Sequence, residues 1–269
     1  MKRIADYLAS LKTIVQQNRV KAVVAALAAG AEFSQLIKPL GQRVLILSPH
    51  PGDEVMAIGG TMAWYAKNDI SMTVITMTAG CRGTNTGKLS KKLGPKRAKE
   101  QQAAFGQLGE EIKTVAWGLD EGFVSDEQLV FTLTDCIDEL NPDIIYIPSL
   151  MDANADSQTA NRLLASALQR LPVTRLRQLW MAQYELWTPI VPNKILSIDE
   201  YQEVKKKAIE CHESQLLCRD YLNAMIGLNR YRAAMLGAGT HAEAYFMSLA
   251  PQYLALSESS STPVLEMVG

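Results

Sequence analysis

The sequence predicts an α/β domain in which helices cover both faces of a mostly parallel sheet. Short, continuously apolar segments typical of fully buried strands alternate along the chain with longer segments of helical periodicity. A chain of 269 residues is long enough for one large α/β domain, or for one domain with an addition. No repeat, low-complexity tract or linker divides residues 41–256, so we expect a single Rossmann-like domain there.

The expected elements follow one another along this domain in α/β order. The apolar run 44–47 ends in Pro-His-Pro-Gly, which cannot continue a strand and leads into a helical pattern. The predicted strands are residues 44–47, 72–77, 113–116, 143–148, 179–185 and 194–198. The predicted helices are residues 54–67, 95–108, 126–139, 158–171 and 199–216.

Two further segments flank the predicted domain. Residues 1–40 are expected to form an N-terminal helical extension, with helices over 4–17 and 19–36. This extension could pack on the domain, or serve as a surface for a second copy of the chain or for a protein partner. Residues 257–269 are rich in serine and contain a proline, so we expect a flexible tail.

Composition limits the partners and compartments to be considered. The formal net charge is −1, so no basic excess points to nucleic acid or to an anionic membrane surface. The four cysteines are scattered and form no Cys-x-x-Cys pair, as expected for thiols in a reducing compartment. Asp6 and Lys12 interrupt any signal-peptide core, and the apolar stretch 20–33 is too short to span a bilayer. We therefore expect a cytoplasmic protein without a transmembrane segment.

The turn after the first strand of the predicted domain carries the residues most suited to chemistry. His50 and Asp53 lie at the carboxyl end of a central strand, where open α/β sheets place their ligand sites. An imidazole and a carboxylate on one tight turn can share a metal ion. The alternative is a structural turn in which Asp53 caps the helix that starts at Glu54 and needs no metal. The sequence leaves both interpretations open.

The segment from His50 to Glu54 resembles the opening His-Pro-Asp-Asp-Glu motif of the PIG-L/LmbE family, zinc-dependent deacetylases of N-acetylglucosaminyl compounds. Further family-like segments follow in the family's order, so the resemblance covers about residues 42–247. They are residues 78–83, the pair Arg97 and Glu100, and residues 117–120, 184–189, 206–215, 227–232 and 242–246. The resemblance implies a Rossmann-like fold and a link to N-acetyl-sugar or glycoconjugate metabolism.

Several positions depart from the residues that the resemblance implies for zinc binding and hydrolysis. His50 and Asp53 match two zinc ligands, but Gly52 stands where the family has its general base. In the later motif, Asn154 replaces the histidine that stabilises the tetrahedral intermediate, and Ser157 replaces the third ligand. Two ligands make a weak site, because a catalytic zinc has three protein ligands. Loss of the base alone lowers the rate by about 10²–10⁴-fold.

A metal site rebuilt from other residues is an alternative. Asp156 could supply a third ligand beside His50 and Asp53, and such an oxygen-rich set favours Mn²⁺ or Mg²⁺ over zinc. The sequence does not place His212 or His241 relative to this turn. We therefore expect a divalent metal to be bound weakly or not at all.

A second group of residues is expected to contact a ligand near the turn. The loop 78–88 lacks the Walker A spacing, because Leu89 follows its final lysine; it is either a plain surface loop or a wall of the pocket. Tyr184 and Trp187 could stack on a sugar ring or pack in the core. The predicted ligand-binding residues are Arg82, Asn85, Arg97, Asp152, Asn154 and Tyr184.

Three functions are consistent with these residues. The first is a pseudoenzyme that binds a carbohydrate-like ligand or a partner protein without deacetylating it. The second is an active, divergent metal-dependent deacetylase or amidohydrolase built around His50 and Asp53. The third is a metal-free enzyme of nucleotide sugars that uses Arg82, Lys88 and Arg97 for phosphate. We predict the first; metal content and nucleotide-sugar binding distinguish the other two from it.

Overall fold

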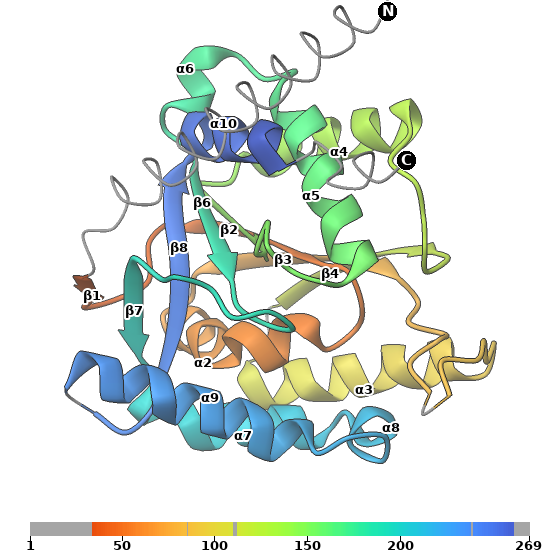
Figure 1. Ribbon diagram of the computed structural model, residues 1–269, viewed down its shortest axis with the longest axis vertical. Coiled ribbons are helices and arrows are strands. Elements are labelled where there is room, and N and C mark those ends of the chain that lie inside the picture. The colour runs from red at the N-terminus through yellow and green to blue at the C-terminus, as the bar shows by residue number, and fades with distance from the viewer. Residues whose placement is uncertain (1–33, 85, 110–111, 238, 261–269) are drawn as a thin grey trace, which may run out of the picture.

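Eight strands form one sheet in the computed structural model, which describes residues 34–84, 86–109, 112–237 and 239–260. The strands are β1 (Ser34–Leu36), β2 (Arg43–Ser48), β3 (Ser71–Thr78), β4 (Ile112–Leu119), β5 (Ile144–Pro148), β6 (Trp180–Tyr184), β7 (Lys194–Ser197) and β8 (Ala242–Leu249). Their order in the sheet is β1-β7-β8-β6-β5-β2-β3-β4 (Figure 1). All pairs are parallel except that β8 runs antiparallel to both β6 and β7. The prediction of a mostly parallel sheet is confirmed.

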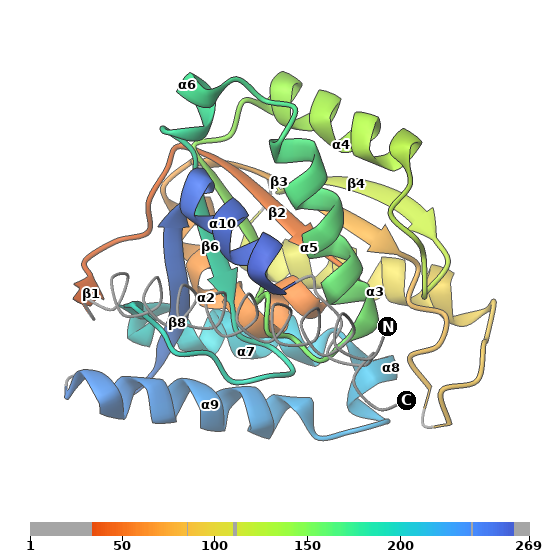
Figure 2. The same cartoon turned by 45° about the horizontal axis from the view of Figure 1, so that its top comes forward.

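Helices cover both faces of this sheet. They are α2 (Asp53–Lys67), α3 (Leu93–Leu108), α4 (Glu127–Leu140), α5 (Ala155–Leu168), α6 (Val173–Leu176), η1 (Asp199–Tyr201), α7 (Gln202–Glu210), α8 (Glu213–Leu216), α9 (Tyr221–Leu236) and α10 (Ala250–Ser260). Helices α4, α5 and α10 pack on one face, and α2, α3, α7 and α9 lie on the other (Figures 1 and 2). This two-sided arrangement is the predicted α/β architecture.

The central strands are buried on both faces because successive side chains of a strand point to opposite sides. In β2, Val44 and Ile46 pack in the cluster on the α2 side, whereas Leu45 and Leu47 pack in the cluster under α4 and α5. Strands β3 and β5 divide their side chains between the same two clusters. This double burial explains why these strands show continuous apolar runs in the sequence.

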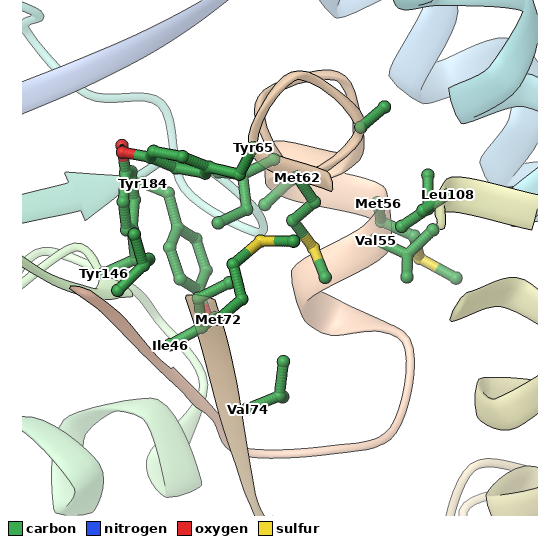
Figure 3. Packing of buried hydrophobic residues seen from close by; sticks show 14 of the residues in the cluster. Ile46, Val55, Met56, Met62, Tyr65, Met72, Val74, Leu108, Tyr146 and Tyr184 are labelled. Carbon is green, nitrogen blue, oxygen red and sulfur yellow. The ribbon is translucent and has the colours of Figure 1, made fainter. Parts of the chain in front are cut away.

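Tyr184, which we predicted to contact a ligand, lies in the core on the α2 side. Figure 3 shows Tyr184 beside Tyr146 and near Tyr65, among the aliphatic side chains between the sheet and α2. Tyr184 is fully buried, and its hydroxyl donates a hydrogen bond to the carbonyl oxygen of Leu47 over 2.9 Å. Tyr184 therefore packs in the core and does not stack on a ligand. The reason is that the last residue of β6 points into the core.

Helix α2 is interrupted near its middle. Ile58 has non-helical backbone angles (φ −127°, ψ 22°). The carboxylate of Glu243 on β8 accepts hydrogen bonds from the N–H groups of Gly60 and Thr61 over 2.8 and 2.9 Å. The same carboxylate pairs with the ammonium group of Lys205 on α7 over 2.8 Å, and both side chains are 1% exposed. Glu243 therefore acts as an internal cap that joins α2, α7 and the sheet.

The start of α5 differs from the predicted one. The helix begins at Ala155 instead of residue 158, because the side chain of Asn154 accepts hydrogen bonds from the N–H groups of Asp156 and Ser157. Asp156 and Ser157 consequently lie in the first turn of a helix and not in a loop. The helix therefore fixes the directions in which these two side chains point, including that of the Asp156 carboxylate.

Both ends of the predicted domain also need correction. Residues 34–36, expected at the end of a helix, form strand β1, which pairs with β7. Helix α10 continues to Ser260, so residues 257–260 are helical instead of forming part of a tail. The predicted helices within residues 1–33 and the remaining tail, 261–269, lie outside the described residues. In the described segments, no helix combines the length and apolar character needed to cross a membrane.

Candidate functional site

A buried carboxylate fixes the turn between β2 and α2. Glu54 accepts hydrogen bonds from the Gln101 amide over 2.8 Å and from the N–H of Gly52 over 3.2 Å. Gly52 has a φ of 102°, a left-handed conformation that favours glycine, and it immediately precedes the first residue of α2, Asp53. Asp53 does not cap the helix; its carboxylate turns back and accepts a hydrogen bond from the N–H of His50 over 3.2 Å. The turn thus directs His50 and Asp53 toward each other.

The imidazole of His50 lies between two carboxylates. Its Nδ1 is 2.9 Å from Asp53 Oδ2, and its Nε2 is 3.0 Å from Asp156 Oδ2. Burial lowers the pKa of His50, but the two carboxylates outweigh this effect and raise it to about 9. Each ring nitrogen therefore lies within hydrogen-bond distance of a carboxylate oxygen. We call Asp53, His50 and Asp156 the carboxylate–imidazole clamp.

The clamp does not fit a metal ion shared by its three residues. The two aspartates contact opposite ring nitrogens, so their oxygens lie on opposite sides of the imidazole and not around one point. Only Asp53 lies on the Nδ1 side of His50, and Asp156 on the Nε2 side could orient the ring but not share an ion with Asp53. In the part of the chain that the structure describes, no group of three or more His, Cys, Asp or Glu side chains is arranged for a metal ion. The predicted ligands His50, Asp53 and Asp156 come together, but not as a ligand set.

A second histidine fills the space beside Gly52. A Cβ atom added to Gly52 would lie 2.8 Å from His212 Cε1 and 2.9 Å from its Nδ1, closer than side-chain atoms pack. His212 is fully buried, and neither ring nitrogen has a hydrogen-bond partner among the described residues. Burial, assisted by the charge of Arg97, lowers the pKa of His212 to about 4, so the ring is neutral. An imidazole therefore closes the position where the family resemblance implies a carboxylate.

His212 reaches this place because the helix predicted over residues 199–216 is broken. Helix α7 ends at Glu210 and α8 begins at Glu213, so His212 lies in the break between them. Glu100 on α3 holds α8 in position, since its carboxylate accepts hydrogen bonds from the N–H and the hydroxyl of Ser214 over 2.8 and 2.6 Å. Helical periodicity does not reveal this break, which is why the sequence could not place His212.

A cavity of about 550 Å³ opens beside the clamp. Its walls come from the segments that follow β2, β3, β4, β5 and β6, and from α8 and the start of α9. The lining residues are His50, Asp53, Arg82, Gly83, Arg97, Glu121, Gly122, Asn154, Ala155, Asp156, Trp187, Gln215 and Tyr221. The cavity therefore lies at the carboxyl edge of the parallel strands, where α/β sheets bind their ligands.

Three of the predicted ligand-binding residues line this cavity: Arg82, Arg97 and Asn154. Asn154 also caps α5 through its side-chain oxygen, so it has a structural role as well. Asn85 lies outside the described residues. Ser157, where the resemblance implies the third zinc ligand, is fully buried in the first turn of α5. A neutral hydroxyl at this position is not among the usual ligands of zinc.

The aromatic wall of the cavity consists of two residues outside the predicted ligand-binding set, although Trp187 was considered for stacking on a sugar ring. Trp187 and Tyr221 form an edge-to-face pair with ring centroids 5.3 Å apart, and both line the cavity. Trp187 lies beyond the end of β6, and this distinguishes it from Tyr184, which is inside the strand. Asp152, predicted to contact a ligand, is instead buried and accepts a hydrogen bond from the N–H of Trp187 over 3.2 Å. Its carboxylate positions the aromatic wall.

Comparison with known proteins gives matches over the same core. A family model described as GlcNAc-PI de-N-acetylase matches residues 45–168. A probable N-acetyl-alpha-D-glucosaminyl L-malate deacetylase 2 of Bacillus anthracis is 26% identical over 188 residues, which are 65% of this chain and 81% of that protein. The N,N'-diacetylchitobiose deacetylase of Pyrococcus horikoshii has a similar structure, with a TM-score of 0.69 at 22% identity over 79% of this chain and 86% of that chain.

A second similar structure is that of a protein named for a different kind of reaction. GalB, the 4-carboxy-2-hydroxymuconate hydratase of Pseudomonas putida KT2440, has a TM-score of 0.62 at 20% identity over 77% of this chain and 95% of that chain. A deacetylase and a hydratase thus share the fold of this chain. The fold alone therefore does not determine the reaction, and function has to be argued from the residues of the cavity.

Proposed function

Because the chain belongs to the PIG-L/LmbE-like deacetylase family, we propose that it binds a carbohydrate-like ligand in the cavity beside the clamp without hydrolysing it. The arrangement at Gly52 carries this proposal. Hydrolysis of an acetamide needs a group that takes a proton from the attacking water, and Gly52 has no side chain to do so. His212 occupies the adjacent space, so no other side chain can enter from that position.

The clamp supports the same conclusion. A catalytic metal needs a third protein ligand beside His50 and Asp53, and among the described residues no group of three His, Cys, Asp or Glu side chains is arranged for one. Asp156 lies on the opposite side of the His50 ring and orients that ring. These contacts support a binding role for the site.

The cavity itself retains features suited to a sugar. Its volume of about 550 Å³ is in the range of small-molecule sites, and the edge-to-face pair Trp187 and Tyr221 provides an aromatic surface. The related proteins named above act on N-acetylglucosaminyl L-malate and on diacetylchitobiose, according to their names. These features support a ligand with a sugar ring, with the remaining specificity set by the charged residues around it.

Metal content tests the proposal directly. We expect protein purified without chelator to contain well below one metal ion per chain by mass spectrometry, with no further loss in Asp53→Ala. We also expect no acetate release from diacetylchitobiose, with or without added zinc, because Gly52 provides no base. Near-stoichiometric metal that disappears in Asp53→Ala, together with acetate release, would instead establish a divergent metal-dependent deacetylase and overturn the proposal.

A further inference from the structure

The outward face of α9 is apolar. Among the sixteen residues of this helix, only Arg230 and Arg232 are charged, and Arg232 is buried in an ion pair with Glu185. Tyr231 is 61% exposed and Met235 is 41% exposed. The full set of exposed residues on α9 is Asn223, Ala224, Gly227, Arg230, Tyr231, Ala234 and Met235. The helix lies at the outside of the layer that covers the α2 side of the sheet, so this face is turned to solvent (Figures 1 and 2).

The other long helices of this layer have charged outward faces. The exposed side chains of α3 and α7 include Lys96, Lys99, Glu203 and Lys207. The inward face of α9 is already occupied, because Ala233 packs against Ile195 and Ala244, and the Asn229 amide donates a hydrogen bond to the Ala242 carbonyl oxygen over 2.9 Å. A helix that is apolar on both faces is normally covered on both, and an exposed apolar face indicates an interaction site.

Gly227 lies near the middle of this outward face. A Cβ added to Gly227 would meet no described atom of another part of the chain within 4 Å. Glycine destabilises a helix interior relative to alanine, and nothing within the described chain requires it at this position. Close approach of a backbone from outside would require it. Gly106 on α3 has the same open space, but its exposed neighbour Lys99 is charged, so only Gly227 combines the two features.

The charges on the face identify the partner. Asp220, immediately before α9, and Arg230 are both exposed, and ten residues of helix separate them by about 15 Å. If two copies of α9 lie antiparallel with Gly227 on a twofold axis, Arg230 of each copy faces Ala224 of the other, one turn from Asp220. Each guanidinium then lies beside a carboxylate, whereas a parallel pair would bring like charges together. The face is therefore complementary to itself.

We propose that two copies of this chain associate through the outward faces of their α9 helices, antiparallel across a twofold axis at Gly227. Such an isologous contact uses the same patch on both copies, covers Tyr231 and Met235, and closes on itself. It is independent of the proposed ligand binding. Tyr221, the first residue of α9, lines the cavity, so the contact extends along the helix to the aromatic wall.

Sedimentation of the full chain at a series of concentrations tests the association. We expect a monomer–dimer equilibrium with a Kd below about 100 µM. Arg230→Glu places two carboxylates together at each end of the contact, and Asp220→Lys places two cations there, so each variant alone should weaken the dimer by about tenfold or more. An equimolar mixture of the two variants restores both opposite-charge pairs and should form a mixed dimer. Because Asp220 also accepts a hydrogen bond from the N–H of Asn223, circular dichroism checks that Asp220→Lys keeps its helices.

A glycine variant separates association from folding. Gly227→Ala is expected to raise the melting temperature of the dilute, monomeric protein by about 2–4 °C, because alanine favours the helix. The same variant should weaken the dimer by about tenfold, since the added methyl group prevents close approach of the two backbones. Gly106→Ala is the matched control: it should raise the melting temperature similarly and leave the Kd unchanged.

Three results would overturn the inference. The first is a wild-type chain that sediments as a monomer up to about 1 mM. The second is a dimer whose Kd does not change in Arg230→Glu or Gly227→Ala, which would place the contact on another surface, such as the N-terminal extension. The third is a mixture of Arg230→Glu and Asp220→Lys that associates no better than either variant alone, because it contradicts the antiparallel pairing. None of these results bears on ligand binding or on acetate release.

Discussion

Replacement of Gly52 by aspartate is expected to lower the free energy of unfolding by about 2–6 kcal/mol and not to produce a deacetylase. The variant restores the residue that the family resemblance implies for the base. At the observed φ of 102°, however, any other residue is strained, at a cost of about 1–3 kcal/mol. The added side chain also overlaps His212, whose Cε1 would lie 2.8 Å from the new Cβ, and such overpacking costs about a further 1–3 kcal/mol.

Urea unfolding of a set of variants separates these causes. Gly52→Ala has the same strain and the same overlap without a carboxylate, so a comparable loss is expected. In the double variant Gly52→Ala/His212→Ala the overlap is removed, and the combined loss should be smaller than the sum of the single losses. A Gly52→Asp variant with wild-type stability and measurable acetate release from diacetylchitobiose would contradict both the packing argument and the proposed function.

The Glu243→Ala variant is expected to lose about 3–5 kcal/mol of stability, because it leaves the charge of Lys205 buried without a partner. The N–H groups of Gly60 and Thr61 also lose their acceptor at the interruption of α2. The measurement is chemical denaturation followed by circular dichroism. Since α2 begins at Asp53, the same variant should also weaken the clamp and reduce ligand binding.

Two controls accompany this measurement. Glu200→Ala removes an exposed ion pair, in which the side chain of Glu200 is 78% exposed and that of Lys67 is 66% exposed. This variant should change the free energy of unfolding by less than about 1 kcal/mol. The double variant Lys205→Met/Glu243→Leu removes both buried charges and should be more stable than Glu243→Ala alone. A loss below about 1 kcal/mol in Glu243→Ala would mean that the interruption of α2 does not depend on this carboxylate.

The sheet could be predicted because burial on both faces leaves a direct mark on the sequence. Each central strand is a short apolar run, and Val44 to Leu47 shows this for β2, which has neighbours on both sides. Strand β8 has no continuous apolar run, because Glu243 interrupts it. The charge of Glu243 is paired with the ammonium group of Lys205, which lies 38 residues away along the chain. A local pattern cannot reveal a partner at that distance.

The site could be predicted in its position but not in its contacts. The turn at His50 follows from local chemistry, and the cavity follows from the convergence of loops at one edge of the sheet. The clamp depends instead on where α5 begins, and one capping residue, Asn154, moves that start by three positions relative to the predicted residue 158. The closure of the space beside Gly52 depends on a helix break near His212. Both are tertiary effects that local sequence patterns do not record.

The carboxylate–imidazole clamp has a consequence for how the walls of the cavity respond to change. It connects segments that follow three strands, because Asp156 contacts His50 after β2 and also accepts a hydrogen bond from Gly122 after β4 over 2.7 Å. These segments line the cavity from different sides. A change at one of them, such as the loss of the His50 imidazole, is therefore expected to displace the others as well.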